Sequence, residues 1–446
     1  MRIYDVIDKK KKGMELTEEE ICFAVNGYVA EEIPDYQIAA FLMAIYFQGM
    51  SDRELVDMTA CMAKSGDMAD LSRIQGIKVD KHSTGGVGDK TTLVVAPLVA
   101  ACGGKVAKMS GRGLGFTGGT IDKLESIPGL ETAMEEEAFF DTVNDLGLAI
   151  IGQSANIAPA DKKLYALRDV TGTVDSIPLI AASIMSKKLA AGSDKIVLDV
   201  TVGSGAFMKN LDDAILLAEK MVAIGEGAGK ETVAILTDMD VPLGEAVGND
   251  IEIIEAIQTL QGGGPEDFWK ICEAFAIAML ILGGIGDEKT CASLVKSAID
   301  EGRALDKFAA MVERQGGDSS YIYHPEKFRK AIYEMKLVAP VDGFVTHMDT
   351  EACGRTAVIL GAGRETKECD IDSRAGIRFY KKTGDPIKQG DVLARLYTSK
   401  EETLQEGMKN LSGAYTFGRE KPQRMKSILA CVTKDGVLRY EKSYSI

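Results

Sequence analysis

The chain has 446 residues, a formal net charge of -15 and only three histidines. This length predicts two or three domains. The acidic excess argues against partners such as nucleic acid and anionic membrane surfaces, because both require a basic face. If the protein handles an anion, its cations must gather in one place.

The sequence also predicts a cytoplasmic protein. The longest apolar stretches, such as residues 274–282, are much shorter than the roughly 20 residues that a membrane span needs. The N-terminus MRIYDVIDKKKKG lacks the apolar region of a signal peptide. The eight cysteines are scattered, with no Cys-x-x-Cys and no neighbouring histidine. This predicts free thiols in a reducing compartment, and neither a zinc site nor a disulfide framework.

The first 65 residues predict three helices and no strand. Capping boxes at Thr17 with Glu20 and at Ser51 with Glu54 begin the first and the third helix. Pro34 suits the first turn of the second helix. Apolar residues at helical spacing follow each of these starts.

Further along the chain, short β-branched runs alternate with helical stretches, which is typical of a parallel sheet covered by helices. A long helix expected at residues 177–191 could belong to either region. After Leu337, short runs punctuated by Gly and Asp predict a mostly β domain. The strands of the α/β region are expected at residues 76–79, 105–107, 148–151, 195–200 and 233–236, and its helices at 92–101, 134–146 and 211–224.

Residues 81–123 are rich in glycine and in basic side chains, with ten glycines, six basic and two acidic residues. Two Gly-rich turns, at residues 81–88 and 108–120, each follow a strand and lead into a helix. Their backbone N–H groups would meet at the carboxyl edge of the sheet. The pattern is neither a Walker A loop nor a strict G-x-G-x-x-G. It predicts a site for a small anion such as phosphate, with His82 beside it as a functional residue.

Two further groups of polar residues leave alternatives open. Ser183 and Lys187 are four residues apart and share one helix face. Together with Arg168 they suit a planar ring that bears carbonyls and an N–H, but a solvated lysine face is the other interpretation. Glu252 and Glu255 lie on a helix, where spacing alone predicts an exposed acidic face.

Several long motifs resemble the signature of the thymidine and pyrimidine nucleoside phosphorylases, and the resemblance covers essentially the whole chain. It implies that inorganic phosphate attacks C1′ of a pyrimidine nucleoside and releases free base and (deoxy)ribose 1-phosphate, in nucleoside salvage. The motifs are KHSTGGVGDKTT, SGRGLGFTGGTIDKLESIPG, LYALRDVTGTVDSIPLIAASIMSKK, LDVTVGSGAFMK, PLGEAVGNDIEIIEAI and KKTGDPIKQGDVLARLY.

The resemblance implies three sets of site residues. Arg168, Ser183 and Lys187 would bind the base, and His82, Arg168 and Lys187 would be catalytic, because they can stabilise charge on the departing base. Whether His82 transfers a proton or only donates a hydrogen bond is left open. Phosphate would be bound by Lys81, His82, Ser83, Thr92, Lys108, Met109, Ser110 and Thr120. A potassium ion would be bound at Gly88, Lys90, Leu243, Ala246 and Glu255, mostly through backbone carbonyls.

The resemblance also bears on substrate range. Lys108 is typical of the enzymes that accept uridine as well as thymidine, which favours that type over a thymidine-restricted one. Phe116 replaces the histidine of the usual GHTGGT motif, so any role of that imidazole is lost and the pocket is expected to be more apolar. A phosphoribosyltransferase of the anthranilate type is the nearest alternative. It would need an acidic pair for magnesium, and none follows the strand that ends at Val200. A non-catalytic binding protein is the third alternative.

The fold implied is of the α/β class, with a small helical domain and a large mixed α/β domain across a cleft. A C-terminal α+β domain follows, and a homodimer through the N-terminal helices is expected. The helical domain would comprise residues 1–67 and 163–193, the α/β phosphate-binding domain 68–162 and 194–335, and the C-terminal domain 336–446.

Overall fold

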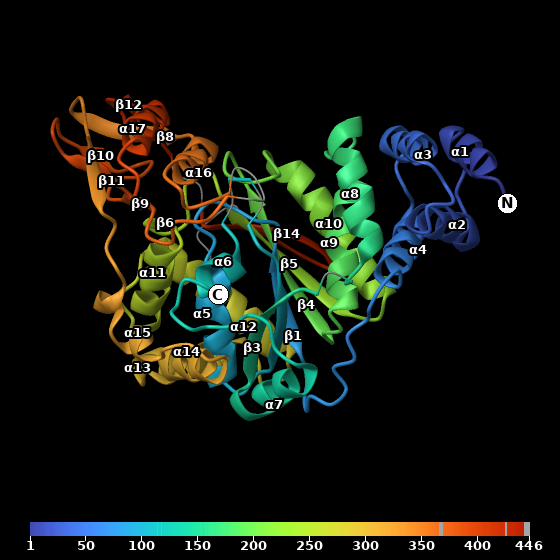
Figure 1. Cartoon of the computed structure of the whole chain (residues 1–446), viewed down its shortest axis with the longest axis horizontal. Helices are drawn as coiled ribbons and strands as arrows, with labels where there is room; N and C mark the ends of the chain where they lie inside the picture. Colours follow the sequence, from blue (N-terminus) through green and yellow to red (C-terminus); the bar gives the residue numbers. More distant parts are fainter. Residues whose placement is uncertain (114, 117, 155, 365–368, 424–425, 441–446) are drawn as a thin grey trace.

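The computed structural model describes residues 1–113, 115–116, 118–154, 156–364, 369–423 and 426–440 (Figure 1). Leu114 and Thr117 of the second Gly-rich turn lie outside the described residues, as do residues 441–446 of the expected C-terminal domain. None of the described helices is long and apolar enough to cross a membrane.

Four helices form the N-terminal end of the molecule, one more than the sequence predicts. Both predicted capping boxes are present, at Thr17 and at Ser51. The additional helix begins at Ile3 without a side-chain cap and buries Lys10, whose ammonium pairs with Glu54 at 2.8 Å. Its lysine-rich sequence concealed it, because the pattern reads as an exposed charge run. The helices are α1 (Ile3–Lys11), α2 (Glu18–Val29), α3 (Asp35–Gln48) and α4 (Asp52–Ala63).

Two later helices, α8 (Pro159–Thr171) and α9 (Ile177–Ala190), pack against this group. The long helix that the sequence left unassigned is α9. It contacts both α4 and α10 (Leu211–Gly227), so it lies between the N-terminal helices and the central sheet (Figure 1). A single apolar core runs from the N-terminal helices through α9 to one face of that sheet.

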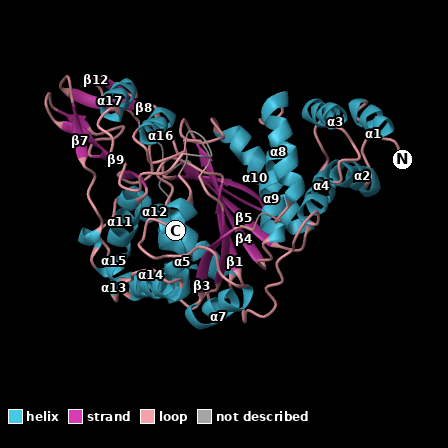
Figure 2. Ribbon diagram, viewed as in Figure 1, coloured by secondary structure: helices cyan, strands magenta, loops and turns pink. Residues whose placement is uncertain are grey.

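The central sheet has the order β1-β4-β5-β13-β14, and Figure 2 labels its strands β1, β4 and β5. The first three strands are parallel, and a bridge between Lys78 and Lys105 adds the parallel pair β2 and β3 beside β1. The strand expected at residues 76–79 instead runs from Val79 to Ser83, because these are the residues that pair with β4. The strands are β1 (Val79–Ser83), β2 (Val106–Ser110), β3 (Leu148–Gly152), β4 (Lys195–Val202), β5 (Glu231–Asp238), β13 (Ile428–Thr433) and β14 (Gly436–Arg439).

Residues 428–439 were expected in the C-terminal domain, residues 336–446, but they belong to the central sheet. Strand β13 pairs with β5 and buries Ala430 and Val432. Without β13, β5 would be an open edge with unpaired backbone groups.

Helices cover both faces of the sheet (Figure 2). Helix α5 is buried along almost its whole length and packs against α12 and α14. These helices carry a second apolar core on the opposite side of the sheet from α9 and α10. The helices are α5 (Thr91–Ala101), α6 (Thr120–Leu124), α7 (Glu136–Leu146), α11 (Asp250–Leu260), α12 (Glu266–Leu282), α13 (Glu288–Asp300), α14 (Arg303–Arg314) and α15 (Ser320–Tyr323).

The C-terminal unit contains the strands that the pattern predicts, together with the helices α16 and α17, so the implied α+β arrangement is confirmed. Its sheets have the orders β6-β9-β11-β7 and β10-β8-β12, and β6 comes from the α/β region. The elements are β6 (Ala246–Gly248), β7 (Tyr333–Val338), β8 (Gly343–Met348), α16 (Thr350–Ile359), β9 (Gly376–Phe379), β10 (Pro386–Ile387), β11 (Val392–Thr398), α17 (Thr403–Gly413) and β12 (Tyr415–Gly418).

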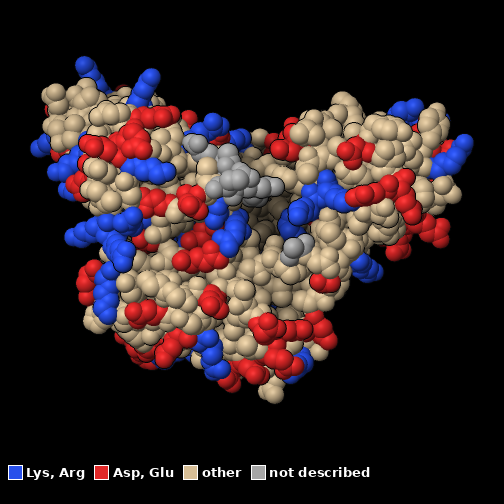
Figure 3. All heavy atoms as spheres, viewed as in Figure 1, with Lys and Arg blue, Asp and Glu red and all other residues tan. Residues whose placement is uncertain are grey.

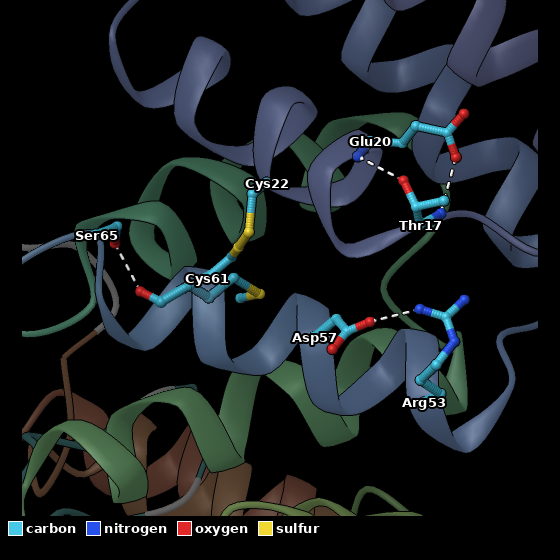
Figure 4. The surroundings of a disulfide bond; sticks show 8 residues. Thr17, Glu20, Cys22, Arg53, Asp57, Cys61 and Ser65 are labelled. Atoms are coloured by element: carbon cyan, nitrogen blue, oxygen red, sulfur yellow. Dashed lines mark hydrogen bonds and ion pairs between the residues drawn. A yellow bond between two sulfur atoms is a disulfide. The ribbon is translucent and has the colours of Figure 1, made fainter.

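The prediction that all cysteines are free thiols is wrong for one pair. Cys22 on α2 and Cys61 on α4 form a disulfide, with their Cα atoms 5.6 Å apart (Figure 4). The 39 residues between them gave no spacing signal, because the pair meets only when α2 packs on α4. Over the described residues, no group of three or more His, Cys, Asp or Glu could hold a metal ion.

Candidate active site

A cavity of about 900 Å³ opens between the α/β region and the helices α8 and α9. Figure 3 shows this face hollowed between the C-terminal unit and the N-terminal helices, with basic side chains on both sides of the hollow. Met109 and Ser110, at the end of β2, line one side of the cavity. Asp161 of α8 and Lys187 of α9 line the other. The cavity therefore joins a predicted phosphate turn to a predicted base-binding residue that lies 77 residues away along the chain.

Strand β1 sends its side chains to two different environments, because successive residues of a strand point to opposite faces. Lys81 points toward α5 and α12. Its ammonium lies 2.5 Å from Thr91 Oγ1, 2.7 Å from Asp199 Oδ2 and 4.9 Å from the centre of the Phe275 ring. Burial opposes this charge, but Asp199 and Asp89 raise the pKa of Lys81 above its ordinary value. The predicted phosphate residue is thus held as a cation at the start of α5.

The other face of β1 carries Asp80, which binds two buried lysines. Asp80 Oδ1 lies 3.2 Å from Lys108 Nζ, and Asp80 Oδ2 lies 2.9 Å from Lys188 Nζ. Lys108 also donates to the backbone carbonyl of Lys81. Burial opposes ionisation of Asp80, yet the two lysines lower the pKa of its carboxyl. Burial lowers the pKa of Lys108 to about 8, with Asp80 offsetting part of that effect.

His82 lies in β1 and not, as expected, in the glycine-rich turn. It shares the face of β1 that carries Asp80. Burial, followed by the positive charges of Lys188 and Lys108, holds the pKa of His82 well below its ordinary value. The imidazole is therefore neutral near pH 7. A neutral ring can donate one hydrogen bond.

The base-binding residues are brought together only in part. Lys187 Nζ lies 2.5 Å from Asp161 Oδ2 and 3.4 Å from Ser183 Oγ, so the predicted shared face of α9 is present. Arg168 is buried where α8 connects to α9, and it is not among the residues that line the cavity. Its guanidinium donates to the backbone carbonyls of residues 173, 174 and 179, at 3.2, 2.7 and 3.0 Å. Arg168 therefore shapes the turn that begins α9.

Three other predicted phosphate residues occupy the first turns of helices or the adjacent strand end. Thr92 is buried in the first turn of α5, and Thr120 is the first residue of α6. Ser83 ends β1, and its hydroxyl accepts a hydrogen bond from the N–H of Gly85 at 3.1 Å. Backbone N–H groups at the start of α5 favour an anion nearby.

Sequence reasoning missed the buried partners of the predicted lysines. Asp199 pairs with Lys81 because register places it beside Ser83 on the neighbouring strand. Lys188 follows Lys187 in the sequence, but it lies on a different face of α9. Its ammonium reaches Asp80. The only available signal was weak: an acidic residue inside an otherwise apolar strand, as in the run KIVLDV.

The predicted potassium residues converge, but on the ammonium of Lys90. Its Nζ lies 2.9 Å from the carbonyl oxygen of Gly88, 2.8 Å from that of Leu243 and 3.0 Å from that of Ala246. It also lies 2.6 Å from Glu255 Oε2. A potassium ion bound by the same four oxygens would coincide with this nitrogen. The residues present therefore do not fit the ion.

The expected exposed acidic face on α11 is wrong. Glu252 and Glu255 are both buried. Glu252 pairs with Lys123 at 2.8 Å, and Glu255 pairs with Lys90. Each glutamate thereby connects α11 to a lysine that closely follows one of the two Gly-rich turns, because a buried carboxylate requires a partner.

The sequence suggested that Phe116 makes the pocket more apolar, but this side chain lies elsewhere. It packs with Val87 against the core of the C-terminal unit. A Cβ added at Gly354 of α16 would lie 3.1 Å from its ring, so the two approach closely. Phe116 is not among the residues that line the cavity.

Three family models match the chain. The glycosyl transferase family a/b domain matches residues 75–305. The helical bundle domain of the glycosyl transferase family matches residues 4–66. The pyrimidine nucleoside phosphorylase C-terminal domain matches residues 344–418. The three matches follow the order of the helical, α/β and C-terminal units.

Curated relatives match over most of their length. The chain is 52% identical over 418 residues to a pyrimidine-nucleoside phosphorylase of Staphylococcus aureus (strain bovine RF122 / ET3-1), covering 94% of this chain and 96% of the relative. It is 53% identical over 403 residues to a pyrimidine-nucleoside phosphorylase of Geobacillus stearothermophilus, covering 90% of this chain and 93% of the relative.

Among solved structures, an anthranilate phosphoribosyltransferase from Thermus thermophilus is similar, with a TM-score of 0.55 and 20% identity. The match covers 70% of this chain and 99% of that chain. At this identity the likeness shows the fold alone. It supports a helical unit beside a large α/β unit.

Proposed function

The chain belongs to the pyrimidine-nucleoside phosphorylase family, and we propose that it cleaves uridine, thymidine and deoxyuridine at the cavity between β2 and α9. Phosphorolysis of pyrimidine nucleosides is its activity. The observation that carries our assignment of the site is that Ser110 and Lys187 line the same cavity from opposite sides. Lys108, at the base of the same turn, supports the broader substrate range over the thymidine-restricted alternative.

In this proposal, phosphate binds where β1 and β2 end. Lys81 would offer its ammonium from the start of α5, and Lys108 would offer its ammonium from beside Asp80. Ser83, Thr92, Ser110 and Thr120 would supply hydroxyls. A phosphate oxygen forms a bond to C1′ while the bond from C1′ to N1 of the base breaks. The electron pair of the broken bond leaves with the base, and the sugar passes through a state with oxocarbenium character.

Lys187 stabilises the negative charge on the departing base. Asp161 and Ser183 orient its ammonium, which is partly open to the cavity. Neutral His82 can hydrogen bond to the base without competing for its proton. Arg168 acts from behind this surface by holding the α8–α9 turn. Preorganised charge of this kind acts most strongly where water is excluded.

The direct test mixes the full-length protein with phosphate and each of the three nucleosides and follows the release of uracil or thymine by absorbance. Release that requires phosphate supports the proposal. Release from thymidine alone would favour the thymidine-restricted alternative. No release from any of the three would contradict it, and a parallel assay with anthranilate, phosphoribosyl pyrophosphate and magnesium tests the remaining alternative.

The KM for phosphate is expected to rise as pH increases through 8. Lys108 has a pKa of about 8, so its ammonium is present below that pH and lost above it. Initial rates at varied phosphate on both sides of pH 8 measure the effect. The control is Lys108→Arg, whose guanidinium stays charged throughout the range. If this variant shows the same rise, another group is responsible and the assignment of Lys108 fails.

We also propose a homodimer that forms through α1 and α3, which pack against each other. Tyr36 and Phe47 are each 74% exposed, and Tyr4 is 66% exposed. Tyr36 and Phe47 are eleven residues apart on α3, about three turns, and so share one face of the helix. Exposed apolar side chains on one face mark interaction surfaces. The double variant Tyr36→Glu and Phe47→Glu is expected to sediment as a monomer. Ile332→Glu, at an exposed apolar residue outside this surface, serves as the control and stays dimeric. A wild-type monomer, or a double variant that remains dimeric, would contradict this interface.

A further inference from the structure

The ammonium of Lys90 is enclosed by oxygen atoms from three separate segments. Gly88 lies in the turn after β1, Leu243 and Ala246 precede or begin β6, and Glu255 lies on α11. The four oxygens are 2.6 to 3.0 Å from Nζ. The side chain is 0% exposed, and the ring of Phe268 closes the site at 4.9 Å. We refer to these four oxygens as the Lys90 cage.

Glycines allow the backbone to approach this closely. Gly88 has a φ of 78°, and a Cβ there would lie 2.6 Å from the carbonyl oxygen of Leu243. Gly244 has a φ of 69°, and a Cβ there would lie 2.2 Å from Glu255 Oε2 and 2.9 Å from Lys90 Nζ. L-residues with side chains rarely adopt such positive φ values. The cage is therefore built by its local sequence and does not result from chance packing.

A second lysine serves the same segment from the C-terminal unit. Lys382 Nζ donates to the carbonyls of Pro242 at 3.3 Å and Gly244 at 2.9 Å, and it pairs with Asp267. Four carbonyls of residues 242–246 are thus satisfied by two ammonium groups. A buried carbonyl without a donor is costly, so this segment depends on positive charge for its conformation.

Carbonyl oxygens together with one carboxylate are the donors that bind hard cations. The Lys90 cage carries a single negative charge, from Glu255, which suits one monovalent cation. Four oxygens at these distances define one position, and Nζ fills it. A metal ion beside it would meet a like charge at close range and would lack the oxygens already used by the ammonium.

We propose that the Lys90 ammonium takes the place of a bound potassium ion, so that this phosphorylase requires no monovalent metal cation. Lys90 is then a positioning residue. It ties the turn after β1 to α11 directly before Thr91 and Thr92, where α5 begins and Lys81 is bound. The inference rests on the cage and not on the proposed substrate range, and it is tested by a readout that needs no substrate.

The first experiment uses the wild-type protein in potassium chloride and in tetramethylammonium chloride at equal ionic strength. The Tm and the rate of uridine phosphorolysis are expected to be the same in both salts. Crystals soaked in thallium(I), a heavy substitute for potassium, are expected to show no anomalous peak between the three carbonyls. A saturable increase in Tm with potassium, or a thallium peak in the cage, would overturn the proposal. Failure of the phosphorolysis assay alone would leave the Tm and thallium results interpretable.

The second experiment opens the cage. Lys90→Ser removes the ammonium and leaves space, whereas the matched variant Lys90→Met removes the charge but keeps the volume. In tetramethylammonium both variants are expected to have a lower Tm than wild type. Potassium should restore the Tm and rate of Lys90→Ser and leave Lys90→Met unchanged. A folded Lys90→Ser protein that does not respond to potassium would overturn the proposal. If that variant does not fold, the wild-type comparison still decides the question.

Discussion

Lys81→Ala is expected to lower kcat/KM for phosphate by about 10²- to 10³-fold, the loss typical of removing one preorganised charged donor. The Lys81 ammonium lies at the start of α5 between Thr91 and Asp199 and is 3% exposed. Because its charge acts on both bound phosphate and the transition state, the KM for phosphate should rise and kcat should fall. Initial rates over a phosphate series measure both constants.

The same substitution also affects stability, and the two effects must be separated. Asp199 would lose its buried partner, and breaking a buried ion pair from one side costs about 3–5 kcal/mol. The double variant Lys81→Ala and Asp199→Asn removes the unpaired charge while Thr237 can still donate to residue 199. Its Tm should recover more than its rate. An unchanged kcat/KM in folded Lys81→Ala would contradict the phosphate assignment.

Lys187→Ala is expected to lower kcat by about 10²- to 10³-fold, with a smaller change in the KM for phosphate. Lys187 lines the cavity opposite Ser110, where it would meet the departing base. Its side chain is 28% exposed, so removing it should destabilise the fold less than removing Lys81 does. Single-turnover rates with uridine measure the chemical step directly.

Leaving-group acidity makes this test specific. 5-Fluorouridine releases a more acidic base than uridine does. If Lys187 stabilises negative charge on the base, Lys187→Ala should slow the cleavage of 5-fluorouridine less than the cleavage of uridine. Equal losses for both nucleosides would show that Lys187 acts in some other way. Lys163→Ala is the control, because Lys163 lies on α8 near Asp161 but pairs with Glu31 on the far side. It should leave both rates unchanged.

Features that depend on near neighbours in the chain were predicted well. The capping boxes at Thr17 and Ser51 are present because each involves residues three apart. Ser183 and Lys187 share a face because one helical turn separates them. By contrast, α1 was missed because its lysine-rich sequence gave no apolar pattern strong enough to predict it.

The placement of individual site residues was less predictable. His82 and Lys81 are adjacent in the sequence, yet the strand directs them to opposite faces, toward different sets of charges. Arg168 was expected in the binding surface, but the carbonyls of the α8–α9 turn bind its guanidinium. A strand that continues four residues beyond its expected end accounts for the first difference.

The sequence by itself determined the family, the glycine-rich turns and the identity of the basic residues that gather near them, because long motifs and local spacing carry that information. Only the tertiary structure decided what each buried charge binds. Lys81 meets Asp199 across 118 positions, and Lys90 meets the carbonyl of Leu243 across 153. A buried ammonium must find oxygen partners wherever the fold brings them. Backbone carbonyls, which every residue possesses, leave no mark in the sequence to identify them.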